Sequence, residues 1–451
     1  MKNGRLPLWR KVGYGMGDAG ANFCWSFIAS FIMIYCTNIL GVSAAVIGTI
    51  MMFSKVLDGV SDIVMGHIID KTHSKMGKAR FWYFISIFPI VLFTFLLFNV
   101  PGSFTDNTKY VYIFVIYTLI GAVFYTANNI AYSSLTALCT KNPKDRVQMG
   151  SYRFIFAIAA ILILSSVTSG IVDHFGGGQK GWTAVAFIYS IVCLVLLLIP
   201  FFAVKELPPE ELNEGEEQAE KSSGFFKDFV LLLKNKYFIM ILFMYIFMYI
   251  LSGLMSGMGI YFATYQLGNA SLLGILNMAS RFPFIVTLPF IPLITTKFGM
   301  RKSILAGDAI GIIGSVMIIA GGLTANFPII LVGFVIRTVG TAPQTGALNA
   351  LIAEADEYSY LKFGKRLTGT IFSCSSVGIK VGTGIGTAAC GFLLDTSGFN
   401  GTAAVQTATA ITAINWAYLL GVALLPVISI VIFYFMKVEK DNEELRKNMG
   451  K

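Results

Sequence analysis

The chain has 451 residues, of which 55% are hydrophobic and only 13% are charged, and its formal net charge is +10. A soluble domain would carry about 25% charged residues, and many apolar runs here reach about 20 residues. A large soluble core is therefore excluded, and the composition indicates an all-α integral membrane protein.

Twelve apolar stretches are long enough to cross a bilayer as helices. They run approximately over 14–38, 42–69, 81–100, 109–138, 147–172, 182–204, 236–263, 271–295, 302–322, 327–353, 367–394 and 410–436. A polar, Glu-rich stretch separates the sixth from the seventh and reads as a solvated linker. The sequence thus predicts two six-helix bundles, 1–204 and 236–436, joined by a cytoplasmic linker at 205–235 and followed by a cytoplasmic tail at 437–451.

The basic residues follow this alternation of loops. We assign 27 of the 34 lysines and arginines to one set of loops and both termini, and only Lys109 and Lys180 to the opposite set. This distribution is the positive-inside pattern of the plasma membrane, and it predicts that both termini are cytoplasmic. The basicity is a topology signal and does not indicate nucleic-acid binding.

The second stretch carries charges at membrane depth, namely Lys55, Asp58 and Asp62. The two aspartates are four residues apart and share a helix face, with Lys55 one turn earlier. Two such carboxylates can clamp a small cation such as Na⁺ or share a proton, and Thr126 could add a hydroxyl ligand. This predicts an ion-coupled transporter. The alternative is that both acids only neutralise Lys55 and Lys380.

A short motif occurs twice, at corresponding places in the two predicted bundles. SKMGKAR (74–80) follows the second stretch, and TKFGMRKS (296–303) follows the eighth. A glycine among cations after the same helix of each bundle indicates a repeated six-helix unit. This turn is similar to the loop signature of the major facilitator superfamily.

Five motifs together resemble the glycoside–pentoside–hexuronide:cation symporter family. They are VGYGMGDAGANF (12–23), LDGVSD (57–62), SKMGKARFW (74–82), YTANNIAYSSL (125–135) and TGTIFSCSSVGIKVGTGIG (368–386). The resemblance implies a major facilitator-type fold with Asp58 and Asp62 as cation ligands. It also implies functional roles for Arg153 and Lys380. Melibiose-type members carry sugar-binding aspartates where this chain has Asn22 and Asn129, which favours a glucuronide or pentoside over a galactoside.

Several polar side chains inside the predicted helices are candidates for sugar binding. Amides donate to and accept from hydroxyls, and an arginine fork grips hydroxyls or a carboxylate, whereas a tryptophan can stack on a pyranose. The alternative is helix packing for the asparagines, packing or an interfacial belt for Trp25, snorkelling to the interface for Arg153, and a lone paired lysine for Lys380. The candidates are Asn22, Trp25, Asn128, Asn129, Arg153, Lys380 and, from the second bundle, Gln344.

Other charged residues favour ion pairs that act as gates or balance charge. The candidates are Lys55 at membrane depth and, at the predicted cytoplasmic ends, Asp70, Arg80, Glu354, Glu357 and Arg366. Arg281 and Asp308, in adjacent predicted helices, are expected to pair with each other.

The sequence as a whole predicts symport of a glycoside, pentoside or hexuronide with Na⁺ or H⁺ by a monomer in the bilayer. Rival functions are a lipid or drug carrier on the same scaffold, or a sugar sensor that does not transport. The three histidines have no metal-ligand spacing, and no phosphate-binding loop, nucleophile elbow or zinc-protease helix occurs. We therefore expect no enzyme activity, no metal and no cofactor besides the coupling ion.

Overall fold

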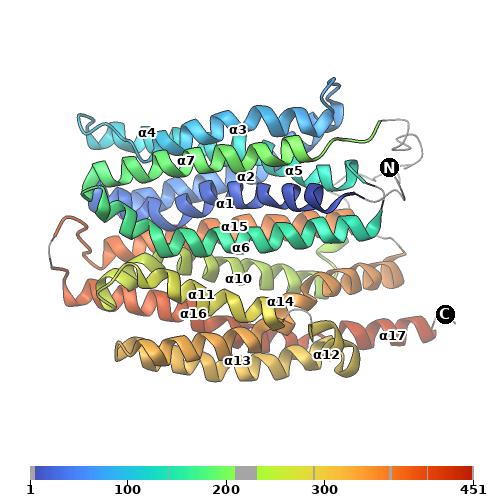
Figure 1. Ribbon diagram of the computed structural model, residues 1–451. Helices are drawn as coiled ribbons and strands as arrows, with labels where there is room; N and C mark the ends of the chain where they lie inside the picture. The colour runs from blue at the N-terminus through green and yellow to red at the C-terminus, as the bar shows by residue number, and fades with distance from the viewer. Residues whose placement is uncertain are drawn as a thin grey trace. The chain divides into compact units, whose positions relative to one another are not determined.

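The computed structural model describes residues 6–140, 142–208, 231–287, 290–364, 368–403 and 405–448, and these are helical with short connections (Figure 1). The helices are α1 Leu8–Ile34, α2 Ala44–Lys71, α3 Lys78–Leu97, α4 Asp106–Thr118, α5 Thr126–Leu138, α6 Pro143–His174, α7 Gly178–Ala203, α10 Lys236–Tyr261, α11 Leu272–Thr287, α12 Ile291–Phe298, α13 Met300–Leu323, α14 Phe327–Phe363, α15 Thr368–Thr396, α16 Ala408–Phe435 and α17 Val438–Asn448. Three π-helical segments continue α1, α4 and α10, namely η2 Tyr35–Ile39, η3 Leu119–Tyr125 and η4 Phe262–Gln266.

Ten helices in the described ranges are long and apolar enough to cross a membrane. They correspond to ten of the twelve predicted stretches. The prediction at 271–295 corresponds to α11 and α12, which flank two residues outside the described ranges. The prediction at 367–394 corresponds to α15, which is not among the ten. The all-helical, membrane-spanning class is as predicted.

The chain forms two compact units. The first comprises the described residues of 1–217, 259–275 and 388–410, and the second those of 218–258, 276–387 and 411–451. The first unit therefore includes short segments from late in the chain. Asn38 donates to the Tyr265 hydroxyl at 2.7 Å, and Ser43 donates to Asp395 at 2.9 Å, so both late segments are hydrogen-bonded to the end of η2 and the start of α2.

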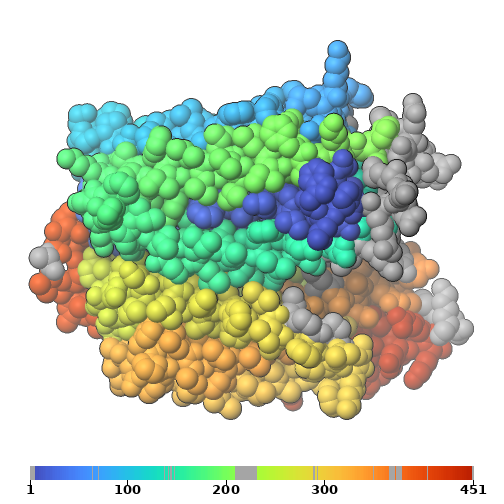
Figure 2. Space-filling model, in the orientation of Figure 1, coloured from blue at the N-terminus to red at the C-terminus, as the bar shows by residue number. Residues whose placement is uncertain are grey.

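In the first unit, α1 lies between α6 and α7, and only a strip of it is visible between them at the surface (Figures 1 and 2). Glycines make this close approach possible. A Cβ atom at Gly15 would lie 2.7 Å from Tyr152 Cβ, and one at Gly20 would lie 2.9 Å from Leu197 Cγ. Small residues are how membrane helices gain packing contacts without a hydrophobic driving force.

In the second unit, α13 and α14 pack against each other through glycines on both helices. A Cβ atom at Gly314 would lie 2.4 Å from the Arg337 nitrogen, and one at Gly340 would lie 2.4 Å from the Gly311 nitrogen. The backbones are thus in direct contact, and the polar side chains of these helices are held at fixed positions beside the seam.

The repeated glycine motif has the same structure in each unit. In the first unit Gly77 has a φ of +104°, and the Glu206 carboxylate accepts from the backbone N–H groups of Lys78, Ala79 and Arg80 at 2.7–3.0 Å. This carboxylate caps the N-terminus of α3. The Arg80 guanidinium in turn donates to the Phe201 carbonyl at 2.6 Å, near the end of α7.

In the second unit Gly299 has a φ of +81°, and Glu439 caps α13 in the same way. Its carboxylate accepts from the N–H groups of Met300 and Arg301 at 3.0 and 3.2 Å. The Arg301 guanidinium donates to the Tyr434 carbonyl at 2.6 Å, near the end of α16. The repeat predicted from two short turns therefore extends to a glutamate and an arginine in each unit.

Helix α14 continues to Phe363, beyond the predicted end of its apolar stretch, and its charged end packs against α17 (Figure 1). The α17 helix is held at its start by Asp441, which accepts from Lys236 and Tyr237 at 2.9 and 2.6 Å. Burial would raise the pKa of Asp441, yet the hydrogen bonds from Tyr237 and Lys236 lower it.

Candidate functional site

Asp58 lies in the middle of α2, about 20 Å from the start of the helix at 1.5 Å per residue. It is buried, and both of its carboxylate oxygens are engaged. Lys55 donates to one oxygen at 3.2 Å, and the Thr126 hydroxyl donates to the other at 2.6 Å. The structure thus brings together three of the predicted residues. Asp62 lies one turn further along α2 and is half-buried.

The Thr126 hydroxyl reaches α2 from the point where a π-helical segment ends. Thr126 follows η3 directly, and π-helical segments are frequent at functional sites because they re-aim the side chains after them. Trp25 packs beside η3, with its ring centroid 5.1 Å from that of Tyr125. The Lys55 ammonium lies 3.9 Å from the Trp25 ring, which is cation–π geometry.

Arg153 forms a fork with Asp18, which is not among the predicted site residues. Its Nε donates to Asp18 Oδ2 at 2.5 Å and a second nitrogen donates to Oδ1 at 3.4 Å. The guanidinium also lies 4.4 Å from the Tyr132 ring. The signal for Asp18 was its position four residues before Asn22, which places the two on one face of α1.

The three predicted asparagines lie in different surroundings. Asn22 donates to the Asp18 carbonyl at 2.8 Å and accepts from Ser26 at 2.8 Å. Asn128 is buried and donates to Tyr83 and Ser86 of α3, which is a helix-packing contact. Asn129 is exposed on α5.

Two predicted residues lie in the second unit. Lys380 is half-buried on α15. Gln344 is fully buried on α14, and neither end of its amide has a hydrogen-bond partner in the described part of the chain. The expected pairing of Arg281 with Asp308 is wrong, because Asp308 accepts a hydrogen bond from the Ser429 hydroxyl of α16 instead.

Some of the predicted gate residues bind identified partners in the described part of the chain. Glu357 binds Arg446 of α17 at 2.6 Å, and Glu354 accepts from Asn442 at 2.8 Å. Arg80 belongs to the cap of the first unit described above. Arg366 lies outside the described residues, as does the side chain of Asp70.

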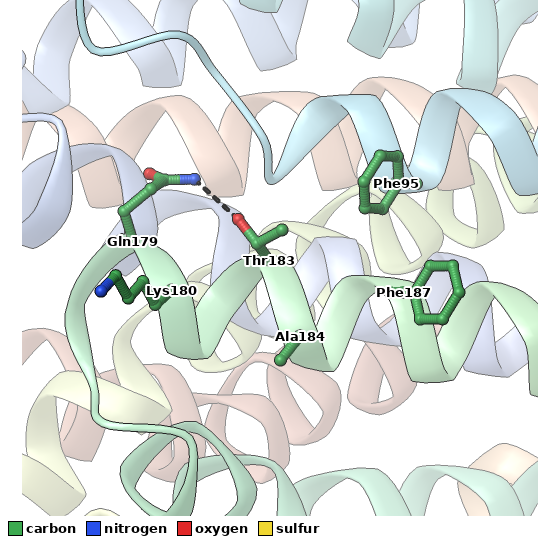
Figure 3. A pocket seen from close by; sticks show the side chains of 6 residues that line it. All are labelled: Phe95, Gln179, Lys180, Thr183, Ala184 and Phe187. Atoms are coloured by element: carbon green, nitrogen blue, oxygen red, sulfur yellow. Dashed lines mark hydrogen bonds between the residues drawn. The ribbon is translucent and has the colours of Figure 1, made fainter.

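A hollow of about 430 Å³ lies against the N-terminal end of α7 (Figure 3). Phe95 and Phe187 form its walls, and Gln179 and Thr183, hydrogen-bonded at 3.1 Å, lie toward one end. None of the predicted site residues lines it. Phe187 is 56% exposed, as expected of a side chain that faces lipid, so this hollow is not the candidate site.

Taken together, the first unit contains a buried carboxylate, an ammonium bound to it, a hydroxyl ligand and a second carboxylate one turn away, all on apolar helices. A family described as MFS/sugar transport protein matches residues 13–440. The chain belongs to this family. It is a multi-pass membrane protein of the sugar–cation symporter class and not an enzyme, which confirms the resemblance drawn from its motifs.

Two relatives align with nearly the whole chain. The chain is 28% identical over 444 residues to the isoprimeverose transporter of Lactiplantibacillus pentosus, and the alignment covers 96% of this chain and 90% of that protein. It is 26% identical over 449 residues to the glucuronide carrier protein homolog of Escherichia coli strain K12, covering 97% and 94%.

Solved structures confirm the major facilitator-type fold. The nucleoside transporter NupG matches with a TM-score of 0.63 at 15% identity, covering 95% of this chain and all of that one. A bacterial homolog of the human lysosomal transporter Spinster, in an inward-facing and unoccupied conformation, matches with a TM-score of 0.64 at 14% identity, covering 98% and 96%.

Proposed function

We propose that this family member couples transport of a sugar or glycoside to a monovalent cation, Na⁺ or H⁺, by alternating access. The observation that carries the proposal is the pair of engaged oxygens on Asp58. A buried carboxylate whose ligands are an ammonium and a hydroxyl offers the hard oxygen ligands that a small cation prefers. The Lys55 ammonium stands in the place that a coupling cation would take, and the two compete for Asp58.

The sugar would bind beside this cation site, among Trp25, Asn22 and Asn129 of the first unit. Binding of each ligand then raises the affinity of the other, and this reciprocal free energy is the coupling. The names of the relatives suggest two substrate probes, isoprimeverose and a glucuronide. The chain would work as a monomer, since Asp58 and Asp62 come from one helix.

The coupled function is tested with the purified full chain in liposomes. Isoprimeverose or a methyl glucuronide is expected to accumulate against its gradient when an inward Na⁺ or H⁺ gradient is imposed, and not without one. Counterflow without net driving force separates transport from mere binding, because a sensor cannot exchange substrate. Accumulation of neither sugar, with uptake of a lipid or an apolar drug instead, would replace this proposal by the carrier alternative.

We also propose that both termini are cytoplasmic, on the support of the asymmetric placement of lysine and arginine. Cysteines introduced at Asn400 and Glu444 are expected to react with an impermeant thiol reagent from opposite sides of the membrane. The unmodified chain is the control for its native cysteines, five of which are buried. Labelling of both introduced positions from outside the cell would contradict this topology.

A further inference from the structure

A pocket of about 370 Å³ lies at the end of the second unit where α17 begins (Figure 1). It is formed where the end of α12, the first turn of α13 and the start of α17 meet. The side chains that line it are Phe298, Arg301, Lys302, Lys437, Glu439 and Lys440. Most of these are cationic, so the pocket is a concave surface with positive charge on several sides.

The three lysines of this pocket are not held by strong partners. Lys302 and Lys437 are exposed and form no hydrogen bond or ion pair within the described ranges. Lys440 pairs with Glu444 of its own helix at 3.5 Å, and the two side chains are 72% and 61% exposed, so that pair holds it only weakly. The Arg301 guanidinium is bound to backbone carbonyls near the end of α16 and contributes its charge. Three ammonium groups are therefore available to an anion.

Acidic side chains around the start of α17 are already engaged. Glu439 lines the pocket, but its two oxygens accept from backbone N–H groups of α13 at 3.0 and 3.2 Å. Asp441 accepts from Lys236 and Tyr237 at 2.9 and 2.6 Å. The pocket thus keeps an excess of positive charge, which a bound anion would balance.

The cap of α13 does not require these lysines. Glu206 caps α3 in the first unit in the same way, and the positions two before and one after it are Val204 and Leu207. The corresponding positions around Glu439 are both lysine. The positive-inside pattern explains cations on this side of the membrane, but it does not explain why they gather around one pocket. The lysines therefore indicate a ligand.

Aromatic side chains place the pocket at the surface of the membrane. Phe298 lines it and is 56% exposed, and Tyr434 and Phe435, at the end of α16, are 61% and 63% exposed. Exposed aromatic residues at the ends of membrane-spanning helices mark the level of the lipid headgroups. In the proposed topology this is the cytoplasmic surface, where anionic lipids give the leaflet a negative potential.

We propose that this pocket binds the phosphate headgroup of an anionic phospholipid. Lys302, Lys437 and Lys440 donate charge-assisted hydrogen bonds to the phosphate oxygens, and Phe298 packs against the acyl chains. A soluble phosphate would meet the same cations but would gain nothing from Phe298. Because the lipid contacts both α13 and α17, it fastens the tail helix to the second unit. The inference does not depend on which sugar or coupling ion is transported.

The test is a calorimetric titration of the purified full chain in a neutral detergent. The ligands are short-chain phosphatidylglycerol, short-chain phosphatidylcholine and glycerol phosphate. Phosphatidylglycerol is expected to bind at least about tenfold more tightly than the other two, because they lack the net charge or the acyl chains. Lys302→Gln, Lys437→Gln and Lys440→Gln are each expected to weaken its binding about fivefold, and the triple variant about 100-fold.

The matched control removes three exposed lysines outside the pocket, in the triple variant Lys71→Gln, Lys75→Gln and Lys447→Gln. In the proposed topology they lie on the same side of the membrane, so the control should bind phosphatidylglycerol as the wild type does. An equal loss in the control would overturn the inference, since general surface charge would then explain the binding. Equal affinity for the two lipids would also overturn it.

A second pair of measurements separates a lipid from a soluble phosphate and covers loss of folding. Phe298→Ala is expected to weaken binding of phosphatidylglycerol and to leave that of glycerol phosphate unchanged. Phosphatidylglycerol should also raise the thermal unfolding temperature of the wild type and of the control more than that of the triple pocket variant. Glycerol phosphate binding as tightly as the lipid would overturn the lipid assignment. Sugar counterflow tests the proposed symport separately, so either proposal can fail while the other stands.

Discussion

Asp58→Asn is expected to abolish cation-driven accumulation of sugar. The substitution removes the negative charge that a coupling ion needs, and it removes the carboxylate that lies 3.2 Å from the Lys55 ammonium. A carboxylate and a cation about 3 Å apart attract each other by roughly 5 kcal/mol at an effective dielectric of about 20, so the neutral amide should bind the cation about 100-fold or more weakly. The measurement is the cation concentration for half-maximal uptake in liposomes, together with the accumulation ratio.

Two companion variants separate this effect from loss of folding. Lys55→Gln removes the competing ammonium and keeps Asp58, so the cation should bind more tightly than in the wild type. Asp106→Asn, whose carboxylate is 67% exposed and pairs with Lys109, changes the same residue type outside the site and should leave coupling intact. If Asp58→Asn still concentrates sugar against a gradient, Asp58 is a structural residue and the proposed coupling site is wrong.

Asp18→Asn is expected to lower the free energy of unfolding by about 2–3 kcal/mol. The estimate lies below the roughly 3–5 kcal/mol of a fully buried pair because the two side chains are 17% and 22% exposed. The cause is the Arg153 guanidinium, which keeps its charge but loses its counter-ion and one of its two acceptors, because only the amide oxygen of Asn still accepts. Denaturant titration of the purified protein in detergent gives the value.

The double variant Asp18→Asn with Arg153→Gln is the matched control for this pair. Removing both charges leaves no unpaired ion, so most of the lost stability should return. Additive losses in the double variant would show that the pair contributes nothing as a pair, and that each side chain acts through separate packing contacts.

The sequence predicted those features that depend on residues close together in the chain. Lys55 and Asp58 are three apart on a helix, so their ion pair follows from spacing, and the repeated turns indicated two related six-helix units. Apolar length predicted the helices, although α14 continues past its apolar stretch because charged residues extend a helix as readily as apolar ones do. Thr126 was predicted because its hydroxyl could bind the cation, and its hydrogen bond to Asp58 did not follow from any spacing in the sequence.

Contacts between residues far apart in the sequence could not be predicted from spacing and periodicity. Asp18 and Arg153 are 135 positions apart, and no periodicity links them. Asn128 was expected to face a sugar, but which way an amide points depends on the rotation of α5 after a π-helical segment that no sequence pattern marks. The Arg281 and Asp308 prediction failed for a similar reason, since the glycine seam between α13 and α14 sets the direction of Asp308.

The matching caps at Gly77 and Gly299 show which part of the six-helix unit is repeated. In both units a glycine precedes the helix, a glutamate accepts from its first N–H groups, and an arginine donates to carbonyls near the end of another helix. The charges inside the helices are not repeated, because α2 of one unit has two aspartates and a lysine at membrane depth, whereas the other unit has Arg281, Asp308 and Arg337 on three helices. The two units therefore share the way in which a helix end is capped, and they differ in the ligands that their interiors can hold.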